Sequence, residues 1–328
     1  MDLYSHIKTY LSEVESIMES DLQHQDERIY GMLIPFIKRG GKRIRPALCL
    51  LSCGAVGGKY DDVVTPASVI ELFHNFTLIH DDIEDDSRFR RGEPTLHVSY
   101  GIPIALNSGD ALYTFLWKKL ISFDMEETKL IKLQKLYAAS FKRVVDGQGI
   151  ELSWIHNNRF DVSESEYLQM INGKTSALMG LSCEIGVFLG GGDKKIQNTL
   201  REYGEKLGTA FQVQDDVLNV IGDFKKYKKE IGGDISEGKR TIMVVHCLNH
   251  SNESDKKQLL SILASHSKKQ ADISTAIKLL EKYGSIEYAK NTAISLVEDA
   301  KKCLSPLKSS KDKKTLEQVA DYVITRET

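Results

Sequence analysis

Hydrophobic residues recur every three or four positions along most long segments of this chain. In residues 112–120 the spacing is carried by Leu112, Phe115, Leu116 and Leu120, and residues 277–283 repeat it. Such spacing places apolar side chains on one face of an α-helix. Alternating patterns typical of strands and hairpins are nearly absent. The pattern therefore predicts an all-α bundle of about ten or more helices.

Glycine and proline mark the predicted breaks between these helices. The breaks fall at residues 39–41, 57–58, 91–94, 101–103, 190–192 and 232–233. No low-complexity linker and no repeat of fixed period separates them. A chain of 328 residues could form one large domain or two ordinary ones, and we predict a single domain over residues 1–328.

The charge balance excludes some partners. The chain carries 44 basic and 46 acidic side chains, for a net charge of -2, so no global field would draw it to nucleic acid or to an anionic membrane. The N-terminal stretch has no basic segment followed by an apolar one, and no apolar run approaches the roughly 20 residues that span a bilayer. We expect a cytoplasmic protein without stable membrane insertion.

The cysteines predict core thiols rather than a metal site. All 5 are scattered, and only Cys49 and Cys53 lie close, at helical spacing. No second pair or histidine accompanies them to complete a zinc site. We expect them to be reduced and buried.

Two acidic clusters, each adjoining apolar helix, are the first candidates for chemistry. Residues 81–86 hold five carboxylates in six positions, and Asp81 and Asp85 would share one helical face. Taken alone, the cluster is more often a solvated helix end. A second pair, Asp215 and Asp216, lowers the odds of that interpretation. Carboxylates from separate helices can face one another across a bundle, where Mg²⁺ would neutralise them and bridge them to phosphate.

Basic residues accompany both clusters. Residues 40–46 read GGKRIRP, a glycine-opened turn with three cations before an apolar helix, which is a pattern suited to binding an anion. Arg88, Arg90 and Arg91 follow the first acidic cluster. These charges could simply pair with one another on the surface, for about 0–1 kcal/mol per pair. Alternatively, the carboxylates hold metal and the cations hold diphosphate groups. Lysines such as Lys174 and Lys239, taken singly, are more often surface residues.

Together these segments resemble the trans-isoprenyl diphosphate synthases, the polyprenyl synthetase family. The resemblance covers nearly the whole chain and rests on seven motifs in order. They are GGKRIRP (40–46), LIHDDIEDDSRFRRGEPTLH (78–97), GDAL (109–112), GQGIEL (147–152), GKTSAL (173–178), FQVQDDVLN (211–219) and GGDISEGKRT (232–241). It implies the isoprenoid synthase fold, a helical bundle around a central apolar cavity, and a homodimer.

The resemblance also implies an activity. The enzyme would join isopentenyl diphosphate head-to-tail to an allylic diphosphate (dimethylallyl, geranyl or farnesyl) and release pyrophosphate, with three magnesium ions per active site. The allylic diphosphate would ionise, the double bond of isopentenyl diphosphate would attack C1 of the cation, and the pyrophosphate would take up the lost proton.

Residue roles are carried over in the same way. Magnesium would be bound by Asp81, Asp85 and Asp215, with Asp82 and Asp216 in support. The diphosphate of isopentenyl diphosphate would be bound by Lys42, Arg45, His74 and Arg91. The allylic diphosphate would be bound by Arg90, Lys174, Lys229 and Lys239. Oxygen atoms of Thr175 and Gln212 would stabilise the allylic cation.

One position departs from the family pattern. The second motif usually ends in a third aspartate, and here that position is Asn219. An amide oxygen can still act as a ligand but carries no charge, so we expect a lower metal affinity on that side. Because Asp215 and Asp216 remain, we expect catalysis to survive.

Product length is predicted from the helix that precedes Asp81. Phe76 and Phe73 share one face of it at increasing depth and would block the growing chain. We predict C15 to C20 products, with geranylgeranyl diphosphate favoured over farnesyl diphosphate; as core residues, the two rings would need no function.

Two other functions stay open. A class I terpene cyclase shares the helical fold and one aspartate-rich motif, but it has no second diphosphate to bind. A non-catalytic regulatory subunit could have lost its aspartates. Here five remain in the two motifs: Asp81, Asp82, Asp85, Asp215 and Asp216.

Overall fold

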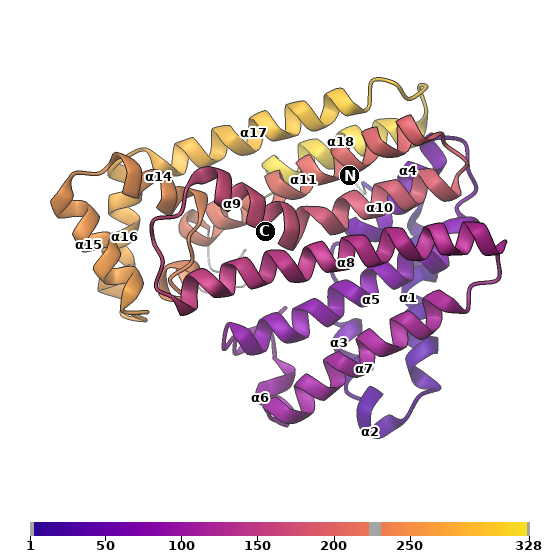
Figure 1. The fold of residues 1–328 in the computed structure, drawn as a ribbon, viewed down its shortest axis with the longest axis horizontal. Coiled ribbons are helices and arrows are strands. Elements are labelled where there is room, and N and C mark those ends of the chain that lie inside the picture. Colours follow the sequence, from indigo (N-terminus) through magenta and orange to yellow (C-terminus); the bar gives the residue numbers. More distant parts are fainter. Residues whose placement is uncertain (1–2, 223–230, 327–328) are drawn as a thin grey trace. The chain divides into compact units, whose positions relative to one another are not determined.

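The computed structural model describes residues 3–222 and 231–326, and its regular structure is almost entirely helical (Figure 1). The predicted all-α class is confirmed. In the described ranges the strands are confined to a short hairpin, in which β1 (Phe89–Arg90) pairs antiparallel with β2 (Glu93–Pro94). No helix in these ranges is both long and apolar enough to cross a bilayer.

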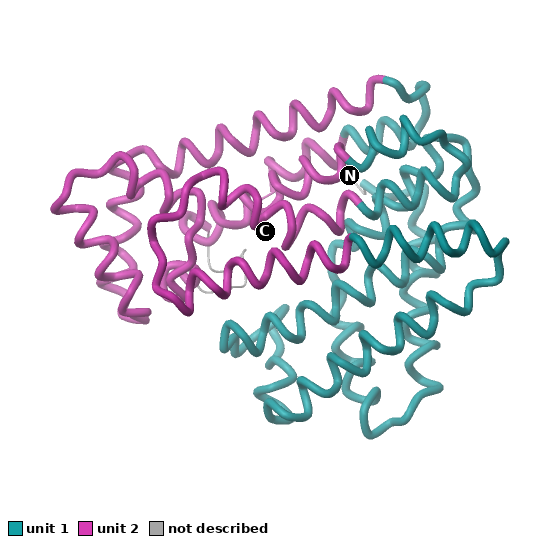
Figure 2. Tube along the Cα trace, viewed as in Figure 1, with its two compact units in different colours: residues 1–139, 181–201, 306–317 teal, residues 140–180, 202–305, 318–328 magenta. Residues whose placement is uncertain are grey.

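The chain divides into two compact units, each assembled from segments far apart in the sequence (Figure 2). Unit 1 comprises residues 1–139, 181–201 and 306–317, and unit 2 comprises residues 140–180, 202–305 and 318–328. The prediction of a single domain over residues 1–328 stays a prediction, as does the central apolar cavity.

Unit 1 is built around the long helix that carries the first acidic cluster. Its complete helices are α1 (Lys8–Gln23), α2 (Glu27–Tyr30), α3 (Leu33–Lys38), α4 (Ile44–Ala55), α5 (Asp61–Glu84), α6 (Leu96–Tyr100) and α7 (Ile102–Ile121). Helix α5 packs against α1, α4 and α7. The predicted apolar face of α7 is buried at Leu112, Phe115, Leu116 and Leu120, which confirms the periodicity.

Unit 2 has its own hydrophobic core. Its complete elements are α9 (Glu164–Ile171), the π-helix η1 (Asn172–Ser176), α13 (Gly233–Ser236), α14 (Ile242–His250), α15 (Glu253–Ala264), α16 (Gln270–Lys282) and α17 (Ser285–Cys303). Its buried residues include Trp154, Tyr167, Val213 and Leu280. Four further helices have residues in both units: α8 (Glu127–His156), α10 (Ala177–Leu189), α11 (Lys194–Ile221) and α18 (Lys311–Thr325).

The prediction of buried thiols is confirmed for four of the five cysteines. All five thiols are free, four are buried and Cys303 is half-buried. Burial raises the pKa of Cys53 and of Cys183 to about 12. These are inert core thiols rather than ligands or nucleophiles.

Candidate active site

The first acidic cluster lies at the C-terminal end of α5. The backbone N–H of Asp85 donates to the carbonyl of Asp81 at 2.9 Å, so these two residues are one helical turn apart as predicted. Both side chains are half-buried, and Asp82 between them is buried. Two carboxylates at this spacing repel each other, which favours a cation beside them.

Asp82 is bound to the hairpin that follows the cluster. Arg90 donates through Nε (2.8 Å) and Nη2 (2.5 Å) to Oδ1 of Asp82. Burial raises the pKa of Asp82, although Arg90 opposes the shift. The other oxygen, Oδ2, is buried with no hydrogen-bond partner among the described atoms. An orphaned carboxylate oxygen beside Asp81 and Asp85 is the donor type that a hard divalent cation requires.

The GGKRIRP turn and the hairpin meet in unit 1. A Cβ atom on Gly41 would lie 3.0 Å from Nη2 of Arg91, so the absence of a side chain lets the guanidinium lie against the turn. Burial holds the pKa of His74 well below its usual value, and Arg45 and Arg91 lower it further. The imidazole is therefore neutral and lies among several arginine cations. This is the arrangement of an anion site.

Arg43 of the same turn also lowers the pKa of His74, but it is held in ion pairs of its own. It is buried, donates to Glu71 (2.8 Å), Glu15 (2.7 Å) and the carbonyl of Ile37 (3.0 Å), and has a φ of 47°. A non-glycine residue in this left-handed region is strained and must be held by its surroundings. Arg43 therefore anchors the turn on α1 and α5, while the neighbouring Lys42 is exposed.

Two aromatic residues of α5 precede the acidic cluster and pack against a tyrosine of α7. The ring centroids of Phe73 and Phe76 are 5.5 Å apart, and Tyr113 of α7 lies 5.0 Å from Phe76 and 6.3 Å from Phe73. Phe73 is fully buried and Phe76 is half-buried, so the rings lie at increasing depth as predicted. The sequence did not indicate Tyr113, because its contact with Phe76 depends on how α7 packs on α5.

In unit 2, Lys174 and Thr175 lie on the π-helix η1, an irregular helical turn of a kind frequent at functional sites. A Cβ on Gly147 would lie 2.2 Å from the backbone nitrogen of Lys174, so α8 can approach η1 this closely only with glycine there. Across this contact Nζ of Lys174 binds Glu151 at 2.5 Å. Glu151 belongs to the GQGIEL motif but was not predicted to be functional.

A chain of hydrogen bonds connects the predicted polar residues of unit 2. The hydroxyl of Thr175 donates to Oε1 of Gln212 (3.0 Å), and Nε2 of Gln212 donates to Asp216 (2.9 Å). Tyr167 donates its hydroxyl to the other oxygen of Asp216 at 2.8 Å. Burial raises the pKa of Asp216 well above its usual value, and Asp234 adds to the shift. The network fixes the orientation of the Gln212 amide.

Three members of this chain, Gln212, Asp216 and Tyr167, line one small pocket of about 50 Å³. Its wall contains Lys174, Gln212, Asp216 and Lys239, together with Glu151, Tyr167, Asp234 and Arg240. Lys239 binds Glu237 at 2.6 Å. The structure thus brings four predicted site residues of unit 2 together. Lys229 lies outside the described residues.

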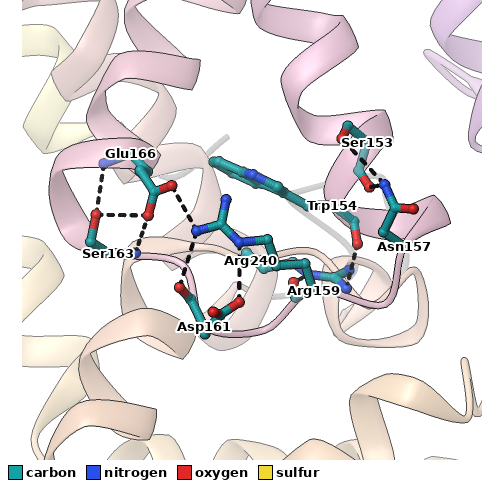
Figure 3. Close-up of polar contacts among 8 residues, drawn as sticks. All are labelled: Ser153, Trp154, Asn157, Arg159, Asp161, Ser163, Glu166 and Arg240. Carbon is teal, nitrogen blue, oxygen red and sulfur yellow. Dashed lines mark hydrogen bonds and ion pairs between the residues drawn. The ribbon is translucent and has the colours of Figure 1, made fainter.

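The loop that carries Lys239 is anchored by the residue after it. Arg240 is buried and donates to the carbonyls of Arg159 (2.7 Å) and Trp154 (2.9 Å) (Figure 3). It also donates to the carbonyl of Gly238. Its guanidinium also stacks on Phe160, 4.0 Å from the ring centroid. Burial lowers the pKa of Arg240 to about 10. The acceptors of these hydrogen bonds are neutral backbone carbonyls. Arg240 therefore anchors the loop to the end of α8 without forming an ion pair through these bonds.

The second acidic motif has partners that the sequence did not indicate. Nη2 of Arg326 lies 2.6 Å from Oδ1 of Asp215. Asn219, where the family pattern has an aspartate, accepts from the backbone N–H of Asp234 at 3.1 Å. This amide therefore joins α11 to the start of α13, a contact that needs an oxygen but no charge.

In the described residues, no group of three or more His, Cys, Asp or Glu side chains is arranged to hold a metal ion. The oxygen donors at Asp81, Asp82 and Asp85 nevertheless fit magnesium, which usually takes one or two carboxylates and completes its shell with water and substrate phosphate. The assignment of Asp81, Asp85 and Asp215 as metal ligands stays a prediction.

A larger cavity, of about 610 Å³, lies elsewhere in unit 1. It is at the N-terminal end of α5, bounded by Asp61, Asp62, Lys119, Asp124 and Lys129 among others. Its charged wall does not suit an isoprenoid chain, and it contains none of the predicted site residues.

Comparison with known proteins decides the family. The polyprenyl synthetase family model matches residues 26–280. The chain belongs to the polyprenyl synthetase family. It is 40% identical to the short chain isoprenyl diphosphate synthase of Methanothermobacter thermautotrophicus, over 95% of each chain. The predicted family is confirmed.

Solved structures of the family agree with the fold. The geranylgeranyl pyrophosphate synthetase of Pyrococcus horikoshii has a TM-score of 0.92 at 33% identity, covering 99% of this chain and 98% of the other. A polyprenyl synthase of Caulobacter crescentus, solved with calcium and isoprenyl diphosphate, has a TM-score of 0.92 at 26% identity, covering 99% and 97%.

Proposed function

We propose that this chain is a geranylgeranyl diphosphate synthase, a short-chain prenyltransferase that adds isopentenyl diphosphate to an allylic diphosphate and releases pyrophosphate. Family membership supports prenyl transfer in general. The similar Pyrococcus protein is a geranylgeranyl pyrophosphate synthetase, and the Methanothermobacter relative is a short chain isoprenyl diphosphate synthase. Farnesyl diphosphate is the alternative product.

The observation that carries the proposal is the cation group around His74. The guanidinium of Arg91 lies against Gly41 of the GGKRIRP turn, and Arg45 and Arg91 both lower the pKa of that imidazole. A terpene cyclase ionises one diphosphate and has no use for a second anion site. We assign this group, with Lys42, to the diphosphate of isopentenyl diphosphate. The neutral imidazole can donate one N–H to a phosphate oxygen.

The allylic diphosphate is assigned to Lys174, Lys239 and Arg90, and also to Lys229. Bound magnesium would neutralise the charge that grows on the departing diphosphate, and Asp81, Asp85 and Asp215 would hold it. As the C1–O bond breaks, oxygen atoms of Thr175 and Gln212 stabilise the cation on C1. The double bond of isopentenyl diphosphate then forms the new C–C bond, and the released pyrophosphate takes up the proton.

Product length is assigned to the ring group of Phe73, Phe76 and Tyr113. Contacts of 5.0–6.3 Å between ring centroids leave no passage for a chain between these side chains. Phe76 is half-buried, as Tyr113 is, and lies closer than Phe73 to the acidic end of α5, so it would meet the growing chain before Phe73. Its ring would end elongation at geranylgeranyl diphosphate.

Product analysis tests the proposal. The purified chain is incubated with Mg²⁺, labelled isopentenyl diphosphate and, in separate reactions, dimethylallyl, geranyl or farnesyl diphosphate. We expect geranylgeranyl diphosphate and no product after chelation of the metal. A hydrocarbon formed without consumption of isopentenyl diphosphate would instead indicate a cyclase, and no product with any primer would indicate a regulatory subunit.

We also propose a cytoplasmic homodimer. Val98, Tyr100, Ile102, Ile104 and Leu106 are each at least 43% exposed, and residues 98–109 carry no charged side chain. A two-fold axis places like residues opposite one another, so an uncharged face avoids like-charge repulsion. Light scattering should give twice the mass of 36.9 kDa, and Ile102→Glu should give monomers. A monomeric wild-type chain would contradict this assignment.

A further inference from the structure

Arg326 is a buried cation that no motif indicates. It follows the last residue of α18, and its side chain is 2% exposed. Besides Oδ1 of Asp215, its Nη2 donates to the carbonyl of Phe211 at 2.8 Å. The guanidinium carbon lies 3.8 Å from the centroid of the Phe211 ring. One planar group therefore touches two residues of α11.

The spacing of these partners explains why arginine suits the position. Phe211 and Asp215 are four residues apart and so lie on the same face of α11. A guanidinium can stack on a ring with its face while it donates from its edge, which a lysine ammonium cannot do. The Asp215 side chain is 25% exposed, more than that of Arg326. The carboxylate thus lies between solvent and a fixed cation.

Arg326 is held mainly by groups other than Asp215. The Phe211 ring, the Phe211 carbonyl and the carbonyl of Val323, 3.3 Å from Nε, do not depend on what Asp215 binds. A cation held in this way sets the direction of one carboxylate oxygen. Partners that orient metal-binding carboxylates commonly contribute 10–100-fold to metal affinity.

We infer that Arg326 is a positioning residue for the second acidic motif: it fixes the Asp215 carboxylate in the orientation that binds the divalent cation of the metal–pyrophosphate complex. The inference rests on the proposed function, since that function makes Asp215 a metal ligand. Arg326 itself would touch neither metal nor substrate.

Metal affinity tests this inference without turnover. Mn²⁺ is titrated into the full chain in the presence of inorganic pyrophosphate, and free Mn²⁺ is measured by electron paramagnetic resonance. We expect Arg326→Gln to weaken binding by about tenfold or more. Arg326→Lys keeps the charge but loses the stacking on Phe211, so its Mn²⁺ affinity should lie between those of wild type and Arg326→Gln.

A matched control separates this effect from a loosened α18. Lys301 of α17 binds Asp321 of α18 at 2.8 Å, with both side chains partly exposed. Lys301→Gln removes a salt bridge of α18 without touching Asp215, and should leave Mn²⁺ affinity within twofold of wild type. In the Asp215→Asn background, Arg326→Gln should cause no further loss, because the two residues act through one carboxylate.

The outcomes are distinct. If Arg326→Gln binds Mn²⁺ as Lys301→Gln does, Arg326 is only structural and the inference is wrong. Tighter binding would overturn it too, because Arg326 would then compete with the metal. A wild-type chain that binds Mn²⁺ and pyrophosphate with this Arg326 dependence but makes no prenyl product would refute the proposed function alone.

Discussion

Removing the Arg43 cation should destabilise unit 1 through the carboxylate that it leaves behind. In Arg43→Met the apolar stem stays, but Glu71, whose side chain is 3% exposed, loses its partner. Breaking a buried ion pair by removing one member costs about 3–5 kcal/mol. Loss of the ion pair between Arg43 and the partly exposed Glu15 should add little to this destabilisation.

The expected change in melting temperature follows from chain length. Unfolding entropy near 60 °C is about 2.1 cal/mol/K per residue, or about 0.7 kcal/mol/K for 328 residues. A loss of about 3–5 kcal/mol therefore lowers Tm by about 4–7 °C. The left-handed backbone at position 43 stays strained in every variant that keeps a side chain, so this strain cancels in the comparison.

The double variant Arg43→Met/Glu71→Met is the decisive control. Replacing both members of a buried pair with apolar residues of similar volume is often neutral, so we expect it to recover most of the lost stability. Calorimetry of wild type and the two variants measures both effects. The reasoning is wrong if Arg43→Met melts within 1 °C of wild type, or if the double variant melts below the single one.

Three further predictions concern the rings of Phe73 and Phe76, the neutral imidazole of His74 and the thiols. Phe76→Ala should lengthen the main product by one isoprene unit, and adding Phe73→Ala should lengthen it again; unchanged product lengths would contradict their assigned role. The folded chain keeps His74 neutral. Below about pH 6.5 the unfolded chain therefore binds more protons than the folded chain does. The free energy of unfolding then falls by up to about 1.4 kcal/mol for each pH unit. Urea unfolding of His74→Asn between pH 7 and pH 5 should lack this loss, and equal pH dependence would refute the assignment. With Ellman's reagent, one thiol of the native chain should react fastest, and Cys303→Ser should abolish that phase; rapid reaction of Cys53, whose pKa burial raises to about 12, would contradict the packing.

Much of the fold could be predicted because helix periodicity is a local property. The apolar face of α7 and the ends of helices at glycine were read from spacing alone. The hydrogen-bond chain from Thr175 through Gln212 to Asp216 joins residues that motifs had already indicated. Their partner Tyr167 was missed, since its hydroxyl reaches Asp216 only through the packing of α9 on α11.

The sequence did not predict which arginines form buried ion pairs within the structure and which are left to bind substrate. Arg43 and Arg45 stand two residues apart in one motif and both lower the pKa of His74, yet Arg43 is buried in ion pairs with Glu71 and Glu15 whereas Arg45 is half-buried. Arg326 is an unremarkable arginine in the sequence, because nothing near it along the chain indicates Asp215. Pairings over such separations depend on how helices pack rather than on local pattern.

Prenyl transfer by two single variants, assayed beside one control, tests the central claim that carboxylates of both acidic motifs serve one reaction. The account predicts that Asp81→Asn and Asp215→Asn each lower kcat by about 10²–10³-fold. Asp146→Asn, which changes an exposed carboxylate bound to Lys142, should match wild type. If either Asp81→Asn or Asp215→Asn retains wild-type kcat, that motif does not act in the reaction and the account is wrong.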